Sequence, residues 1–570
     1  MKFLLLTLFI FPIFIQSQIN PKTKWGDVSD AEINLKEVPF EKNADAVVLY
    51  ESGDLTVAYQ NWGNKIYKRI KILTEKGKEM ADYDLIYFSL NDFESILSLN
   101  AQTINFENGK KEITPVKNKD IYDLPYSGYY RTKRFAFPNV KVGSIIELEY
   151  NLVNRFHSYM EGWVFQHEIP TLYSSLSVDV QAPVDYIPIL HGERIIAESK
   201  EEKKRKNHKN HWTLTDLPSI DQPEFLYNPR DFEERIDFQL RGYHHKNGSY
   251  VNEVIHWTDI NRIFKKDFVN YYDEKTTQNI GRRILNKSDE KEQIQAALEY
   301  FKTNYHWDNF TNVIPRKSLL EVDQSKKGST SEINLLLHYV LLEKGIRSQL
   351  VLISKRKNKK LQTAYPYFNQ FSSIINLITL DDGNTFLIDA SQLADYGFQF
   401  MPLYNYNHIG LVVNSDKADF ISVTPPLSEF HLTESYHFTE HKINSQKIEK
   451  KSGYFLDETI STNYPTQKAL DIHFSETSQS PDLKLENNFI SSKKQFQSEN
   501  QNPNFFTFQN PLVPSLKPFN FTDAHRDKPI EFDFPMYQKI IISSKIPKGF
   551  QVVLPKDFNA HYQLGENDLM

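Results

Sequence analysis

The chain has 570 residues, of which 40% are hydrophobic and 25% charged, and 67 Lys and Arg residues face 73 Asp and Glu residues. At roughly 150 residues per domain, this length predicts three or four domains. The 40 Phe, 31 Tyr and 6 Trp residues supply large surfaces for burial, which makes disorder a poor description of most of the chain. A net charge of −6 gives no electrostatic footprint for nucleic acid.

The chain contains no cysteine. This excludes disulfide bonds, zinc sites with cysteine ligands, iron–sulfur clusters, catalysis by a thiolate and an N-terminal lipidated cysteine. Any chemistry that needs a thiolate is therefore excluded.

The start of the chain has the pattern of an export signal. Lys2 precedes an apolar run over residues 3–15, and Ser17 supplies a small residue for cleavage. A retained membrane anchor is the alternative, but the run is shorter than the roughly 20 residues of a spanning helix, and Pro12 interrupts it. We therefore predict a signal peptide over 1–17 and secretion across the inner membrane. The mature chain is expected to lack a transmembrane helix and to be periplasmic or peripherally associated with the envelope.

The block between about Leu55 and Tyr243 is rich in predicted strands. Alternating or β-rich segments bounded by turn residues predict strands over Lys65–Leu73, Ser144–Leu152 and Leu176–Ala182. Hairpin turns are expected at residues 75–78 and 107–110, where a glycine supplies the positive φ. The charged run over residues 199–209 is expected to be a solvated hairpin tip.

The middle of the chain has the pattern of an α+β block. Apolar residues recur at helical spacing over Asp289–Asn304 and Ser331–Lys344, and Gly345 marks the end of the second helix. Strands are predicted over Gln349–Ser354, Ser373–Leu380 and Thr385–Asp389. Two helices that lead into an antiparallel sheet predict the α+β class. The basic run Lys355–Lys360 between the strands is expected to be an exposed loop.

Strand patterns return after about Pro426, for example over Lys447–Ile460 and Lys539–Ser544. His437 and His441 lie on one face of a possible strand, with His431 nearby, and three imidazoles can hold zinc. Histidine pairs at even spacing arise easily in β-structure, so neither a metal site nor a cofactor is predicted.

The most informative segment is KGSTSEIN at residues 327–334, which opens the second predicted helix. The small residues at a helix start, the apolar helix, the following Gly-Ile and the strands that end in LIDA at residues 387–390 resemble the core of the transglutaminase-like superfamily. The resemblance implies a papain-like α+β fold. Active members use a Cys–His–Asp triad in which the helix N-terminus stabilises the cysteine thiolate.

The triad positions of the family fall on Thr330, Ser373 and Asp389 of this chain. The histidine position carries a one-residue uncertainty, but neither Ser373 nor its neighbours Ser372 and Ile374 can act as a general base. The resemblance therefore implies a degenerate site that retains only the aspartate.

A hydroxyl nucleophile at Thr330 would need an adjacent base. His338 lies eight residues further along the helix, which is about 12 Å along its axis. The competing interpretation is structural, because Ser329 and Glu332 have the spacing of a capping box. Capping is the better explanation, so no catalytic residue is expected.

The flanks resemble the domains that often accompany this core in secreted bacterial proteins. The N-terminal signals are FAFPN at 135–139, GSIIE at 143–147 and the Trp163-x-Phe165 pair, which resemble a β-domain of unknown function. Arg526 and the Ile546-Pro547 pair resemble the β-domain that often follows the core. Relatives usually continue through further strands, so the C-terminal domain is expected to be incomplete.

The sequence therefore predicts a multidomain α+β protein. The expected parts are an N-terminal β-sandwich-like domain at 18–250, a transglutaminase-like core with a helical lead-in at 251–415, and a mainly-β domain at 416–570. The leading hypothesis is a non-catalytic binding or scaffolding module whose partner is an envelope protein, a peptide or a glycan, without nucleic acid. The alternatives are an amide-bond hydrolase or acyl transferase with a hydroxyl nucleophile, and a purely structural protein whose cleft is filled by side chains.

Overall fold

The computed structural model describes most of the chain. The described residues are 24–59, 61–127, 129–155, 160–205, 210–223, 225–394, 397–414, 417–439, 442–456, 475–476, 484–486, 489–499, 526–551 and 553. The chain divides into two compact units, which we call unit 1 and unit 2. Unit 1 comprises residues 1–222, 229–256 and 365–367, and unit 2 comprises residues 223–228, 257–364 and 368–570.

Unit 1 contains three sheets. The largest has seven strands in the order β12-β10-β1-β2-β8-β4-β5, the second has the order β3-β7-β6, and the third has the order β11-β13-β14 with β9 beside β13. The strands of the largest sheet are β1 (Ala46–Val57), β2 (Trp62–Ile72), β4 (Glu94–Glu107), β5 (Lys110–Pro115), β8 (Ile145–Asn154), β10 (Thr171–Val180) and β12 (Asn210–Leu217). The other strands are β3 (Asp82–Phe88), β6 (Tyr122–Ser127), β7 (Tyr130–Ala136), β9 (Trp163–Val164), β11 (Val184–His191), β13 (Arg235–His244) and β14 (Tyr250–Asn252).

Helices are few in unit 1. The α-helices are α1 (Asp30–Asn34) and α2 (Glu193–Arg205), and short 3₁₀ helices cover Lys76–Ala81, Leu90–Asp92, Asn118–Asp120 and Pro229–Phe232.

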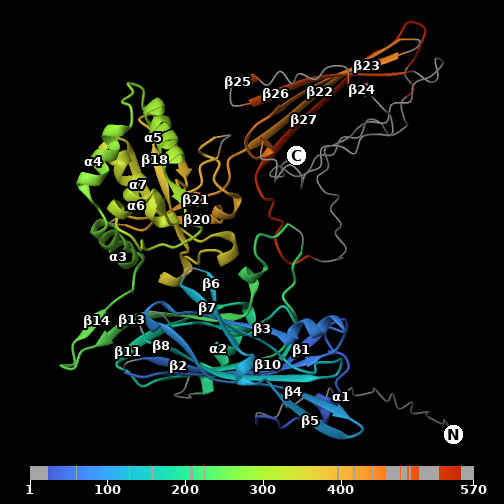
Figure 1. The fold of residues 1–570 in the computed structure, drawn as a ribbon, viewed down its shortest axis with the longest axis vertical. Coiled ribbons are helices and arrows are strands. Elements are labelled where there is room, and N and C mark those ends of the chain that lie inside the picture. Colours follow the sequence, from blue (N-terminus) through green and yellow to red (C-terminus); the bar gives the residue numbers. More distant parts are fainter. Residues whose placement is uncertain are drawn as a thin grey trace, which may run out of the picture. The chain divides into compact units, whose positions relative to one another are not determined.

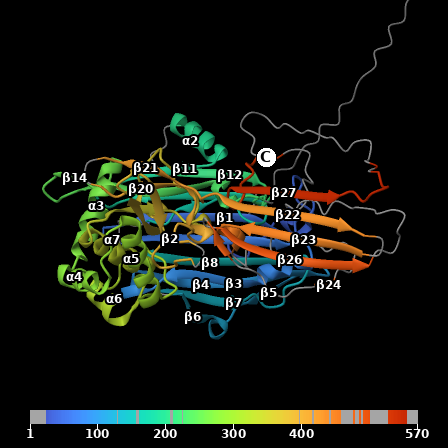
Figure 2. The ribbon, with the colours of Figure 1, turned by 90° about the horizontal axis from the view of Figure 1, so that it is seen from above.

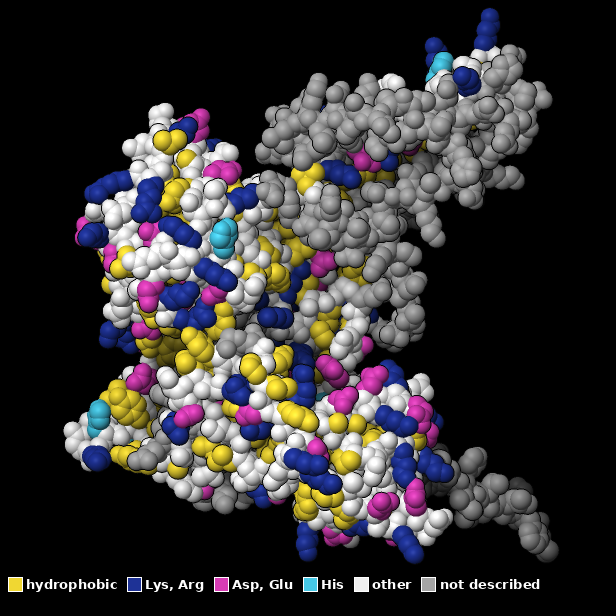
Figure 3. All heavy atoms as spheres, in the orientation of Figure 1, with side chains coloured by type: hydrophobic (Ala, Val, Ile, Leu, Met, Phe, Trp, Pro, Cys, Tyr) yellow, Lys and Arg dark blue, Asp and Glu magenta, His cyan; other side chains and the backbone are white. Residues whose placement is uncertain are grey.

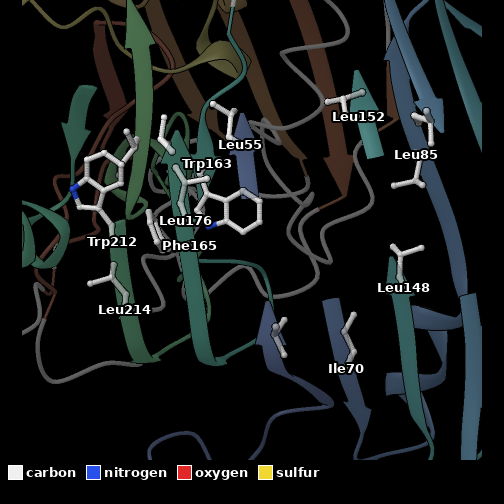
Figure 4. Packing of buried hydrophobic residues seen from close by; sticks show 14 of the residues in the cluster. Leu55, Ile70, Leu85, Leu148, Leu152, Trp163, Phe165, Leu176, Trp212 and Leu214 are labelled. Atoms are coloured by element: carbon white, nitrogen blue, oxygen red, sulfur yellow. The ribbon is translucent and has the colours of Figure 1, made fainter. Parts of the chain in front are cut away.

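One hydrophobic core joins the three sheets of unit 1. It contains Leu55 and Leu176 of the seven-stranded sheet, Leu85 of β3 and Trp163 of β9 (Figure 4). A Cβ atom on Gly53 would lie 2.6 Å from Cζ3 of Trp163, so this glycine lets the indole ring lie directly on β1. The inward-facing apolar residues of the predicted strands meet in this core, and a second, smaller cluster that includes Leu49 and Ile145 packs on the other face of the large sheet.

Two turns of unit 1 were predicted in the same way and gave opposite outcomes. The turn at residues 107–110 joins β4 to β5 in an antiparallel hairpin, and Asn108 and Gly109 both have positive φ. The hairpin at residues 75–78 is wrong, because β2 and β3 lie in different sheets and a 3₁₀ helix joins them. Gly77 serves close packing instead, since a Cβ there would lie 2.0 Å from the carbonyl oxygen of Asp45.

The predicted hairpin tip at residues 199–209 is also wrong, because the described part of this charged run is helical. Helix α2 extends through it to Arg205, between β11 and β12, and residues 206–209 lie outside the described residues. Glu, Lys and Arg are good helix formers, which explains why a strongly charged run continues a helix.

Unit 2 contains a helical layer, a five-stranded sheet and a C-terminal sheet. The helices are α3 (Trp257–Asn270), α4 (Glu274–Arg283), α5 (Glu290–Asn304), α6 (Leu319–Ser325) and α7 (Thr330–Glu343), with 3₁₀ helices at Arg356–Asn358, Phe368–Gln370, Leu403–Asn405 and Gly453–Leu456. The five-stranded sheet has the order β19-β18-β17-β20-β21, and a short parallel pair joins β15 to β16. These strands are β15 (His306–Trp307), β16 (Lys327–Gly328), β17 (Arg347–Ile353), β18 (Ser373–Thr379), β19 (Thr385–Ile388), β20 (His408–Val412) and β21 (Asp419–Val423).

The C-terminal sheet has the order β24-β26-β23-β22-β27, with β25 paired to β26, and Figure 2 shows β27, β22, β23 and β26 side by side. Its strands are β22 (Ser428–Phe438), β23 (Lys442–Lys451), β24 (Ser475–Glu476), β25 (Lys484–Glu486), β26 (Phe489–Glu499) and β27 (Met536–Lys545). His431 and His437 both lie on β22, and His441 lies outside the described residues.

The five-stranded sheet is covered on both faces. Helix α7 packs against β17 and β18 on one face (Figure 1). On the other face, Val351 and Ile375 pack in one cluster with Phe430 and Leu432 of β22 and with Phe534. Packing against the five-stranded sheet therefore fixes the position of α7 within unit 2.

The coarse prediction of a strand-rich mixed α+β protein with several sheets is confirmed. The helices predicted over Asp289–Asn304 and Ser331–Lys344 correspond to α5 and α7. Among the residues that the structure describes, no helix is both long and apolar enough to cross a bilayer. The predicted signal peptide at 1–17 lies outside the described residues.

The prediction of an exposed loop over Lys355–Lys360 is wrong for its first two residues. Lys355 is 2% exposed and Arg356 is 8% exposed. The Arg356 guanidinium lies 3.5 Å from the ring centroid of Tyr227 and donates hydrogen bonds to Asp533 and to the carbonyl of Tyr406. A charged side chain can be buried when its partners come from distant parts of the chain, and a local run of sequence does not reveal those partners.

Candidate active site

The connection between α6 and α7 places a capped helix start in the interior of unit 2. Lys326 ends α6 in the left-handed conformation, and Ser329 then precedes α7 with an extended backbone. The Ser329 side chain accepts a hydrogen bond from Glu332 N, and Glu332 Oε2 accepts one from Ser329 N at 2.7 Å. The predicted capping box is therefore confirmed.

Thr330, the residue that the transglutaminase-like resemblance assigns to the nucleophile position, is fully buried. Its backbone N–H donates to the carbonyl oxygen of Phe310 at 3.1 Å, and its hydroxyl lies 3.4 Å from the same atom. Trp307 Nε1 donates to that oxygen at 2.9 Å. The Thr330 hydroxyl thus faces a hydrogen-bond acceptor that cannot remove its proton at neutral pH.

Glu332 carries internal hydrogen bonds at the start of α7. Besides its bond with Ser329, its Oε1 accepts hydrogen bonds from the backbone N–H groups of Arg316 and Lys317, at 2.8 Å and 3.0 Å. Arg316 Nε lies 3.6 Å from the same oxygen. Glu332 is fully buried. Glu332 therefore joins the segment at Arg316 and Lys317 to the start of α7 and satisfies the backbone N–H of Ser329.

Asn334 connects α7 to the end of β19. Its Nδ2 donates to the carbonyl of Thr330 and to Asp389 Oδ1, both at 2.9 Å, and its Oδ1 accepts a hydrogen bond from Ala390 N at 2.8 Å. On its other side, Asn376 Nδ2 of β18 lies 3.0 Å from Asn334 Oδ1. Asn334 was not indicated as a site residue by the sequence, although a polar residue inside an apolar helix is a signal for a buried partner.

Asp389, which the resemblance assigns to the aspartate position of the triad, is 1% exposed. Its Oδ1 accepts hydrogen bonds from Asn334 and from the hydroxyl of Ser391, and its Oδ2 accepts one from Asn405 Nδ2 at 2.8 Å. In active members the aspartate orients a histidine ring. In this chain, the Asp389 carboxylate instead accepts hydrogen bonds from amide and hydroxyl groups.

Ser373 lies on the face of β18 opposite to α7. Asn376 faces α7, because it bonds to Asn334, and Ile375 faces the core on the other side of the sheet. Side chains alternate along a strand, so Ser373 shares the face of Ile375, and Ile374 shares the face of Asn376. The structure therefore links Thr330 and Asp389 through Asn334 and leaves Ser373 on the opposite face.

A polar chain runs from Asn376 to His338. Ser348 Oγ lies 3.3 Å from Asn376 Oδ1, and His338 Nδ1 lies 3.1 Å from Ser348 Oγ. Burial lowers the pKa of His338 to about 4, so its ring is neutral at pH 7. His338 therefore bonds to β17 and is engaged away from Thr330.

Lys355 is a residue of this site that sequence reasoning missed. Its Nζ lies 3.2 Å from Thr311 Oγ1 and 4.7 Å from the ring centroid of Tyr404. Burial lowers the pKa of Lys355 to about 8, and the charge of Asp389 opposes that shift. The signal that could have indicated burial is that only Ser354 separates Lys355 from the apolar strand β17.

These contacts leave the site closed to solvent. Thr330, Ser373 and Asp389 are each at most 1% exposed, and Lys355 is 2% exposed. The side chains present can hold α7 against the sheet through hydrogen bonds. A substrate carbonyl would need both access to Thr330 and a base beside it.

Comparison with known protein families gives a match for part of unit 1. Residues 59–221 match the family model of a domain of unknown function with a solved structure, DUF3857. This part of unit 1 thus resembles DUF3857. The matched residues include the GSIIE and Trp163-x-Phe165 motifs of the predicted N-terminal domain. No curated protein matches the chain.

Among solved structures, the chain is similar to a crystal structure from Parabacteroides distasonis whose protein is provisionally named a protease. That similarity covers 80% of this chain and 94% of the other, with a TM-score of 0.55 and 13% sequence identity, and it indicates a shared fold. Yeast leukotriene A4 hydrolase matches over 41% of this chain and 35% of its own, with 10% identity and a TM-score of 0.19, which does not indicate a shared fold.

Replacing Lys355 with methionine is expected to stabilise unit 2. Because the pKa of Lys355 in the folded protein, about 8, lies below its ordinary value, the charged form is penalised by folding at pH 7. The free energy of unfolding should rise by about 1–3 kcal/mol in Lys355→Met at pH 7. The penalty is relieved as pH rises through about 8 toward 10.5, so the gain should shrink at about pH 9.5. Urea unfolding at the two pH values measures it.

The exposed Lys357 of the same basic run provides the control, since Lys357→Met should change stability by less than about 0.5 kcal/mol. An equal loss of stability in Lys355→Met at both pH values would contradict the prediction. It would mean that the contacts with Thr311 and Tyr404 outweigh the cost of burying the charge.

Proposed function

We propose that this chain is an exported protein of the bacterial cell envelope, periplasmic or peripherally attached, whose transglutaminase-like core is non-catalytic and acts as a binding or scaffolding module. Export rests on the pattern of the first 17 residues, and the core assignment rests on the KGSTSEIN and LIDA motifs. The observation that supports the non-catalytic role is the hydrogen bonding of Asp389. Both of its carboxylate oxygens accept hydrogen bonds, from Asn334, Ser391 and Asn405.

The burial of the site favours the scaffolding part of this proposal. A cleft that holds a peptide or glycan presents its residues to solvent when empty, whereas Thr330 and Asp389 are at most 1% exposed. Asn334 forms hydrogen bonds with Thr330 and Asp389, the residues at the assigned nucleophile and aspartate positions, and with Ala390. These bonds join α7 to the end of β19. The partner in the envelope would therefore bind elsewhere on the molecule.

The alternative is an amide-bond hydrolase or acyl transferase that uses the Thr330 hydroxyl. Within the one-residue uncertainty of the histidine position, Ile374 lies on the face toward α7, and its side chain is not a base. His338 is neutral and bonded to Ser348. The enzymatic alternative therefore requires another base that reaches the Thr330 hydroxyl. Burial lowers the pKa of Lys355 to about 8, but its Nζ bonds to Thr311.

An amide-bond assay tests the proposal. The mature chain, Thr330→Ala and Thr330→Ser are screened for hydrolysis and amine incorporation on peptides, casein and bacterial cell wall. We expect the three proteins to give the same background, because no hydroxyl is activated. Activity that Thr330→Ala abolishes and Thr330→Ser retains would overturn the proposal and establish a hydroxyl nucleophile. Crosslinking in the envelope that returned no partner would count against the scaffolding role.

A further inference from the structure

A pocket in unit 1 lies where three connections meet at the end of β13. Its volume is about 790 Å³, within the range of small-molecule sites. It is lined by Tyr59 after β1, by residues 182–184 at the start of β11, and by Leu240 with residues 243–247 at the end of β13. These connections lie far from α7 in sequence, so the pocket is independent of the closed site in unit 2 and of the proposed role of the core.

The pocket combines an apolar base with a ring-lined edge. Ala182 and Leu240 are each 8% exposed, which identifies them as the apolar base. At the edge, the rings of Tyr243 and His245 lie 5.3 Å apart, and His244 packs edge-on against Tyr250 at 4.8 Å. Figure 3 shows a histidine next to hydrophobic side chains over the β13–β14 hairpin. Rings around an apolar base are suited to an aromatic or aliphatic group.

The charge at the pocket is positive. Among the described residues that line the pocket, Lys246 is the only Lys, Arg, Asp or Glu. The nearby carboxylate of Asp185 is compensated, because Arg241 Nε lies 3.2 Å away and the Tyr250 hydroxyl donates to it at 3.0 Å. An exposed lysine beside an apolar cavity attracts a negatively charged group on an apolar ligand.

We propose that this pocket binds an apolar or aromatic group that carries a carboxylate. The apolar part would lie on Leu240 and Ala182 among the rings, and the carboxylate would bind Lys246. A free organic acid and the C-terminal residue of a peptide share this chemistry, and only the peptide brings further chain to the edge of the pocket. The proposal gives unit 1 a ligand site to which the DUF3857-like residues 59–221 contribute Tyr59 and residues 182–184, while Lys246 lies beyond them.

The test compares an acid with its amide on the mature chain. N-acetyl-L-phenylalanine should bind about fivefold tighter than N-acetyl-L-phenylalaninamide in calorimetric titration. Lys246→Gln should remove that difference by weakening the acid alone, and Asn247→Asp, which places an opposing charge at the same edge, should do the same. Lys110→Gln, at the exposed tip of the β4–β5 hairpin, should leave both affinities unchanged.

A peptide that ends in phenylalanine, with a free or an amidated carboxyl group, distinguishes the two sources. Tighter binding of the free-acid peptide than of N-acetyl-L-phenylalanine supports a peptide terminus, and equal binding supports a small organic acid. Both Lys246 and Asn247 are exposed, so their variants should unfold at the temperature of the unmodified protein. Equal binding of acid and amide, no binding of either probe, or an unchanged acid affinity in Lys246→Gln would overturn the proposal.

Discussion

Replacing Glu332 with alanine is expected to lower the free energy of unfolding of unit 2 by about 3–4 kcal/mol. The fully buried carboxylate accepts hydrogen bonds from the backbone N–H groups of Ser329, Arg316 and Lys317, and all three would lose their acceptor. Each buried donor left without a partner costs about 1–3 kcal/mol. Urea unfolding measures the loss, and Glu332→Gln, which keeps an acceptor oxygen, should cost less than the alanine variant.

The chain offers a matched control in the capping box of α6. Ser318 and Glu321 make the same pair of hydrogen bonds as Ser329 and Glu332, but on the exposed surface. Glu321→Ala should therefore cost about 0.5–1 kcal/mol, the worth of a cap alone. If the two alanine variants lost the same amount, burial and the contacts with Arg316 and Lys317 would contribute nothing, and the prediction would be wrong.

The comparison of these two boxes shows where sequence reasoning succeeds. The S-x-x-E spacing and the apolar periodicity are local properties, so they located the start of α7 and the extents of α5 and α7 correctly. The same reasoning could not show that one box is buried and the other exposed. Burial is decided by which distant segments pack over the helix start, and here these are the loop at Phe310 and the segment at Arg316.

The positions that were mistaken share the same cause. The turn at Gly77 has the residues of a hairpin, but the strands it joins belong to different sheets, and sheet membership is set by pairing over long distances. The basic run at Lys355 has the composition of a solvent-exposed loop, yet Arg356 is buried against Tyr227 and Asp533. Local composition predicts local structure, whereas the partners that neutralise a charge are found only in the folded chain.

The sequence assigned residues to the candidate site, but it did not reveal their geometry. The motifs assigned Thr330 and Asp389 to the positions of the family's nucleophile and aspartate, and the structure joins them through Asn334. The strand register decides which face a residue occupies, and a shift of one residue reverses it. This is why Ser373 lies on the far face of β18 and why Asn376 was missed, whereas Lys355 was missed because its burial depends on partners outside the local sequence.

Arg69 is expected to give the largest loss of stability in unit 1. Its guanidinium lies 2.6 Å from Glu147 and 2.6 Å from Glu32, and all three side chains are 0% exposed. Arg69→Met would remove the cation that bridges the two buried carboxylates. It would also break one of the links between α1, which carries Glu32, and β2, where Lys71 Nζ still donates to the carbonyl of Ile33. We expect the free energy of unfolding to fall by about 3–5 kcal/mol in urea titration.

A rescue variant separates the cost of unpaired charge from the cost of lost packing. Combining Arg69→Met with Glu32→Gln and Glu147→Gln removes the uncompensated charges and should recover most of the loss, because a buried ion cluster can often be replaced by neutral groups of similar volume. Arg134→Met serves as the control, since Arg134 pairs with Asp84 on the surface and should cost about 0.5 kcal/mol. A loss in Arg69→Met no larger than in Arg134→Met would show that the buried cluster contributes no more than an exposed pair. A triple variant as unstable as Arg69→Met would instead assign the loss to packing of the arginine against Tyr67, whose ring centroid lies 5.6 Å from its Cζ.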